Sequence, residues 1–66
     1  MTAGETELQM CIRHVTEQEA RIARQKALIG RLRKSRNPLL DDALRLLDEM
    51  HGFLDVMRDH VARLQT

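Results

Sequence analysis

The chain has very few of the residues that cross-link a fold, interrupt a helix or favour a sheet. Its 66 residues include no Trp or Tyr, one Phe, one Pro, three Gly and one Cys. Because Cys11 has no partner, a disulfide framework within the chain and a zinc site made only of cysteines are both excluded. β-Branched residues are also few, which disfavours strands. The residues that remain, mainly Leu, Ala, Arg, Glu, Gln and Met, favour an all-α protein.

Signals for secretion and for a membrane are absent as well. Residues 1–5 are neither basic nor apolar, unlike a secretory leader. No apolar run approaches the roughly 20 residues that a membrane span needs. The net charge of +1 gives no overall preference for nucleic acid or a membrane surface. We therefore expect a cytoplasmic protein without membrane contact, where an unpaired thiol is common.

Apolar residues recur at spacings of three and four in two segments, which is the period of an amphipathic helix. The second segment carries an uninterrupted row: Leu40, Ala43, Leu47, Met50, Leu54, Met57, Val61 and Leu64. The first segment carries a row with two polar slots: Leu8, Cys11, Val15, Gln18, Ile22, Gln25, Ile29 and Leu32. The two glutamines predict amides that hydrogen-bond across the helices and fix their register, or that reach water at the seam edge. A polar pair that binds a ligand is the functional alternative.

The break between the two rows is the segment Ser-Arg-Asn-Pro at 35–38. Asn37 is a good N-cap, and Pro38 at the first helical position loses no hydrogen bond there. At the front of the chain, either Thr2 or Thr6 is a suitable N-cap. We therefore expect one domain over residues 1–66, made of a helix over about 5–35, a turn at 35–37 and a helix over about 38–65.

Folding the chain back at the turn brings the two rows into antiparallel register. The facing pairs include Leu32 with Leu40, Gln25 with Leu47, Ile22 with Met50, Gln18 with Leu54, and Leu8 with Leu64. A second row on the later helix, one residue earlier in each heptad, consists of Leu39, Leu46, Phe53 and His60. It widens the apolar face beyond what one partner helix can cover.

The surplus apolar face predicts a homodimer that forms a four-helix bundle. The expected interface residues are Leu39, Leu46, Phe53, Met50 and Met57. A trimer, or docking on an unidentified protein partner, would satisfy the same requirement. The predicted function is that of a small structural or interaction protein.

Three residues are candidates for chemistry. Cys11 and His14 share a helix face, and the register places His60 close to both. Thiolate and imidazole are zinc ligands, but this set lacks the paired spacing of known zinc motifs. A catalytic Cys–His pair would need a pocket that a narrow bundle does not offer. We therefore expect no metal, no cofactor and no enzymatic activity.

A run of seven basic residues without an acidic one provides the alternative function. It consists of Arg21, Arg24, Lys26, Arg31, Arg33, Lys34 and Arg36. Such a run suits the phosphates of RNA. The competing interpretation is a solvated helix face neutralised by the later helix's acids, Asp41, Asp42, Asp48 and Glu49. No aromatic residue is interleaved to stack on bases, which favours the solvated face.

Several residues on both sides of the turn form a familiar pattern. They are His14, Val15, Glu19, Ile22, Arg24, Gln25, Leu28, Ile29, Leu32, Ala43, Leu46, Leu47, Met50, Leu54, His60, Arg63 and Leu64. Over about residues 12–65 the chain thereby resembles a family of short uncharacterised alphaproteobacterial helical-hairpin proteins. The turn in that family often contains Gly, where this chain has Ser-Arg-Asn-Pro. The resemblance implies a bacterial hairpin protein, and it supplies no catalytic residues because the family has no assigned activity.

Overall fold

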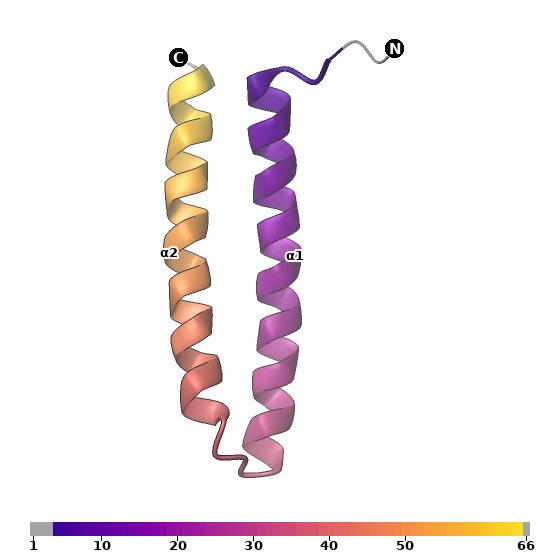
Figure 1. The fold of residues 1–66 in the computed structure, drawn as a ribbon, viewed down its shortest axis with the longest axis vertical. Helices are drawn as coiled ribbons and strands as arrows, with labels where there is room; N and C mark the ends of the chain where they lie inside the picture. The colour runs from indigo at the N-terminus through magenta and orange to yellow at the C-terminus, as the bar shows by residue number, and fades with distance from the viewer. Residues whose placement is uncertain (1–3, 66) are drawn as a thin grey trace.

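Two antiparallel helices packed side by side make up the fold (Figure 1). The computed structural model describes residues 4–65. Helix α1 spans Glu7–Lys34 and helix α2 spans Leu40–Gln65. The predicted all-α hairpin is thus confirmed, with a connection of five residues in place of the expected three. No helix within residues 4–65 combines the length and the hydropathy needed to cross a bilayer.

The start of α1 is held by a capping box. The Thr6 side chain accepts a hydrogen bond from the Gln9 backbone N–H at 3.0 Å, and the Gln9 side chain accepts one from the Thr6 N–H at 3.0 Å. Two of the free N–H groups at the helix start are thereby satisfied. Of the two predicted caps the structure assigns Thr6, while Thr2 lies outside the described residues. Nearby, a hydrogen bond from Arg13 lowers the pKa of the exposed Glu5 carboxyl.

The connection reverses the chain through a left-handed residue. Arg36 has a φ of 51°, and the N–H groups of Arg36 and Asn37 bond back to the carbonyls of Arg33 and Leu32. This pattern of two hydrogen bonds is the Schellman motif, in which the residue with the left-handed backbone conformation is usually Gly. Arg36 therefore holds a backbone conformation that costs a non-glycine residue about 1 kcal/mol or more.

Asn37 then caps the second helix, although α2 begins two residues later than predicted. The Asn37 side-chain oxygen accepts from the Leu39 N–H at 2.9 Å, and the Asn37 carbonyl accepts from the Leu40 N–H at 3.1 Å. The hydrogen bond between Leu40 and Asn37 joins residues three apart, where an α-helix joins residues four apart. The chain therefore makes one turn of the tighter 3₁₀ type before the α-helix starts. Pro38 lies in this tighter turn, two residues before α2 begins at Leu40, and not at the first helical position as predicted.

The predicted seam lies between the helices as expected. All of its positions, from Leu8 to Leu32 on α1 and from Leu40 to Leu64 on α2, are buried or half-buried. The best-covered residues are Gln18, Ile22, Ile29, Ala43 and Leu54. Leu44, which the seam pattern omitted, is half-buried too. Each helix thus presents one stripe to the other.

The two seam glutamines hydrogen-bond across the hairpin. Gln18 Nε2 donates to the Met50 carbonyl at 3.0 Å, and Gln25 Nε2 donates to the Ala43 carbonyl at 2.9 Å. A helix carbonyl points toward the N–H four residues later. The bonded carbonyls therefore point toward Leu54 and Leu47, the residues that the sequence register places opposite the two glutamines. The register and the cross-helix role of the amides are both confirmed.

A substitution at Leu54 tests the packing of the seam, because only 4% of the Leu54 surface is exposed. We expect Leu54→Ala to lower the free energy of unfolding by about 2–5 kcal/mol, since the truncation leaves a cavity between the helices. Urea denaturation followed by circular dichroism measures the change. The adjacent exposed variant Asp55→Ala should stay within about 0.5 kcal/mol of the parent. Equal effects of the two variants would contradict the packing described.

The left-handed residue gives a second prediction. Arg36→Gly should raise the free energy of unfolding by about 0.5–1 kcal/mol, because Gly adopts a positive φ without a steric penalty. Thermal unfolding compares it with Arg33→Gly, which places Gly inside the last turn of α1 and should be destabilising. A loss of stability in both variants would show that the Arg36 side chain outweighs its backbone strain.

Candidate interaction groove

The second apolar row predicted on α2 is exposed to solvent. Phe53 is 65% exposed, Leu39 59% and Leu46 48%. Met50 and Met57, the other two expected interface residues, are half-buried between this row and α1. Helix α1 therefore covers the seam row of α2 and leaves the neighbouring row exposed to solvent, as the width of the apolar face predicted.

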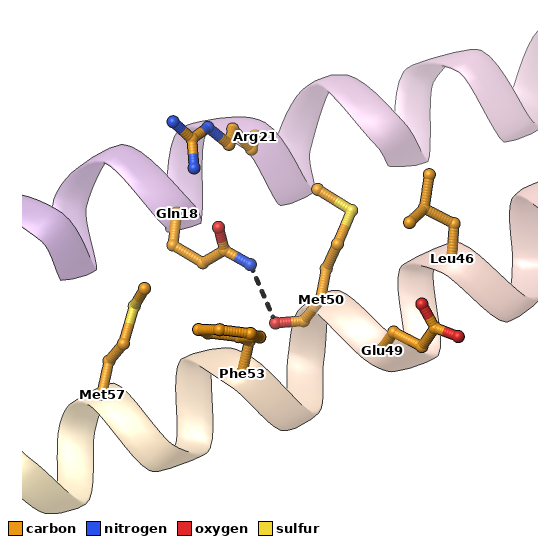
Figure 2. Close-up of a pocket in the computed structure, with 7 residues that line it drawn as sticks. All are labelled: Gln18, Arg21, Leu46, Glu49, Met50, Phe53 and Met57. Carbon is orange, nitrogen blue, oxygen red and sulfur yellow. Dashed lines mark hydrogen bonds between the residues drawn. The ribbon is translucent and has the colours of Figure 1, made fainter.

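Three adjoining hollows turn this row into one continuous groove. The central hollow, drawn in Figure 2, is lined by Gln18, Arg21, Leu46, Glu49, Met50, Phe53 and Met57. The turn-end hollow is lined by Gln25, Leu28, Leu32, Leu39, Asp42, Ala43 and Leu46. The open-end hollow is lined by Cys11, His14, Val56, Met57 and His60. Because Leu46 and Met57 are each shared by two hollows, we name the three together the apolar groove.

Two charged residues line the central hollow. Arg21 extends from α1 and Glu49 from α2 (Figure 2). Within residues 4–65 neither of them forms an ion pair, whereas Arg58 and Glu19 pair across the helices at 2.7 Å. The hydrogen bond from Gln18 to Met50 fixes the height at which the two helices meet here. In this register Arg21 lies opposite His51, so Arg21 and Glu49 are offset by two residues, about 3 Å along the helices, on the two sides of the groove.

A fourth hollow shares no lining residue with the three hollows of the apolar groove. It is lined by Ile12, Val15, Arg58, Val61, Ala62 and Gln65. Ile12 is 44% exposed, close to the exposure of Leu46. Ile12 therefore provides an apolar surface residue outside the groove with which groove residues can be compared.

The hollows are small and shallow. The largest of these four hollows, the one at the turn end, encloses about 270 Å³, whereas small-molecule sites usually enclose about 300–1,000 Å³. A long apolar groove of this kind suits the side chains of another helix better than a metabolite.

Cys11, His14 and His60 do meet at the open-end hollow, as the register predicted. His60 Nε2 lies 3.7 Å from a carboxylate oxygen of Glu7. Over residues 4–65 no group of three His, Cys, Asp or Glu side chains is arranged to hold a metal ion. Cys11 makes no hydrogen bond to either histidine among these residues. The three side chains therefore share a surface without forming a metal centre or a nucleophile–base pair.

All seven residues of the basic run are exposed: Arg21, Arg24, Lys26, Arg31, Arg33, Lys34 and Arg36. Successive helical residues are turned by about 100°, so the run is distributed around α1 and not on a single face. Within residues 4–65 no residue of the run forms an ion pair with the acids of α2. Asp42, for example, pairs with Arg45 of its own helix at 2.7 Å.

The sequence pattern did not predict that Met10 and Val56 are exposed apolar residues, or that Arg21 and Glu49 line the groove. Met10 and Val56 are large, apolar and exposed, although neither belongs to a predicted row. Arg21 precedes the seam residue Ile22 as Phe53 precedes Leu54, so the same heptad offset would have placed Arg21 beside the groove.

Comparison with protein-family models, curated proteins and solved structures found no match. The site is therefore interpreted from its geometry alone.

Proposed function

We propose that this chain is a small interaction module that pairs with a second copy of itself through the apolar groove, forming a four-helix bundle. The observation that carries the proposal is the exposed row Leu39, Leu46 and Phe53 along one face of the hairpin. Contiguous exposed apolar patches of this kind mark interaction sites. A two-fold dimer covers the same row on both copies at once.

The thickness of the hairpin supports a second layer. The hairpin is a single layer, because α1 and α2 lie side by side and no third helix or strand in residues 4–65 covers either face (Figure 1). Stable domains generally contain two packed layers. In the described part of the chain, no large side chain is fully buried. A second hairpin on the groove supplies the missing layer.

The exposed area agrees with the size of one interface. The chain exposes 5280 Å², whereas a compact monomer of its 7.7 kDa mass exposes about 4,300 Å². The excess is close to the roughly 800 Å² that each partner buries in a standard protein–protein interface. One copy of equal size is therefore enough to cover it.

Two further parts of the proposal concern chemistry and location. We assign no catalytic role, because the groove is shallow and apolar and its Cys11, His14 and His60 make no nucleophile–base contact. We place the protein in the cytoplasm, where the free thiol of Cys11 is stable.

Sedimentation equilibrium tests the dimer directly. We expect a mass twice the 7.7 kDa of the chain, and we expect Leu46→Glu to give a folded monomer, because two charges would then be buried in the interface. Ile12→Glu introduces the same charge at a similarly exposed apolar site outside the groove and should leave the dimer intact. A wild-type monomer at high concentration, or dissociation by Ile12→Glu alone, would contradict the proposal.

A second candidate function is RNA binding by the basic run. The specific observation in its favour is that its seven exposed cations, named above, form no ion pair within residues 4–65. Unneutralised cations attract phosphates and release the counterions condensed on them. Their spread around α1 weakens this candidate relative to self-association.

RNA binding through the run predicts a steep salt dependence. Affinity for a single-stranded RNA should fall markedly between 50 and 200 mM salt, roughly in proportion to the number of phosphate contacts on a logarithmic scale. The triple reversal Arg24→Glu, Arg31→Glu and Arg33→Glu should abolish binding. Arg45→Glu on α2 is the matched control and should change it little. Filter binding or fluorescence anisotropy measures the affinity, and equal affinity of the triple variant and the parent would exclude this function.

A further inference from the structure

We infer that the two hairpins of the proposed dimer pack with their turns at the same end, so that α1 of each copy lies against α2 of the other. This inference rests on the proposed self-association and adds the orientation of the second copy. It follows from two features of the groove: the unpaired charges in its central hollow, and the different chemistry of its two ends.

When the helices of the two copies run along one another, two arrangements let the same groove face itself across a two-fold axis. With the axis parallel to the helices, the turns lie at the same end and α1 packs against α2 of the second copy. With the axis perpendicular to the helices and parallel to the groove face, the turns lie at opposite ends and α1 packs against α1. In either case each contact occurs twice or lies on the axis.

The central charges distinguish the two arrangements. Arg21 and Glu49 lie on opposite sides of the groove, close to the middle of their helices, with their backbones offset by about 3 Å along the helix axes. With the turns together, Arg21 of each copy faces Glu49 of the other, which gives two reciprocal ion pairs. With the turns apart, the two Arg21 side chains come together beside the axis. Like charges that meet across an interface oppose association, whereas opposite charges fix orientation.

The ends of the groove favour the same arrangement. The turn-end hollow is lined mainly by apolar side chains, including Leu28, Leu32 and Leu39. The open-end hollow carries the two imidazoles of His14 and His60. With the turns together, each hollow packs against its own counterpart, so leucines meet leucines. With the turns apart, the leucines would desolvate the imidazoles without offering them a hydrogen bond, which is unfavourable.

Charge exchange tests the inference. Arg21→Glu and Glu49→Arg should each weaken the dimer by about tenfold or more, and the double variant should restore it to near the parent value. Lys26→Glu makes the same change in charge on a different side of α1, about 140° around the helix from Arg21, and serves as the control. Sedimentation equilibrium gives the dissociation constants, and circular dichroism verifies that each variant is folded. An unchanged dimer in Arg21→Glu, or no recovery in the double variant, would overturn the inference.

Fluorescence energy transfer measures the orientation independently of charge. In a Cys11→Ser background, labels at Lys34→Cys should lie about 20–25 Å apart with the turns together, against about 40 Å with the turns apart.

The outcomes separate the orientation from the dimer itself. A wild-type chain that stays monomeric in sedimentation would overturn both the dimer and its orientation. A stable dimer whose Lys34→Cys labels are far apart would overturn the orientation alone and leave self-association standing.

Discussion

A pair of helices can cover only one stripe on each member, and this geometric limit governs the rest of the hairpin. The stripe between α1 and α2 contains the predicted heptad rows, with Ile22, Ile29 and Leu54 as its most covered apolar residues. Everything beyond the stripe is left to solvent or to another chain, including Phe53 and Leu46. The apolar groove is therefore the direct consequence of a face that is wider than one helix contact.

The two glutamines show how a polar residue is accommodated in such a narrow seam. Gln18 and Gln25 donate to carbonyls of the opposite helix, and no buried side-chain N or O atom in residues 4–65 lacks a partner. Because a shift of one turn would place other residues at these positions, the two hydrogen bonds favour a single register. The same register places Arg21 and Glu49 within two residues of one level in the groove. An amide pair that aligns the hairpin thus also sets the positions of these two charged residues relative to each other.

The proposed bundle combines these elements at increasing scale. Caps at Thr6 and Asn37 and the left-handed Arg36 set where each helix begins and ends. The seam then holds two helices in register, and the groove left beside it is proposed to hold two hairpins together. Apolar area supplies the driving force for the second step, while unpaired charge selects among the arrangements that bury it. This division is common in oligomers, where hydrophobic burial stabilises and electrostatics specifies.

The sequence by itself determined the two helices, their antiparallel seam and the exposed row at Leu39, Leu46 and Phe53. These features follow from a strict local period and from Asn37-Pro38, and local period and capping are properties that a sequence displays directly. The tertiary structure alone decided that Gln18 and Gln25 bond to carbonyls, and that Arg36 takes the left-handed position of a five-residue connection. It also decided that Arg21 and Glu49 line one hollow without pairing, and that the basic run stays unpaired with the acids of α2. Those outcomes depend on side-chain reach and on the height at which two helices meet, and neither quantity is encoded in the spacing of residues along one helix.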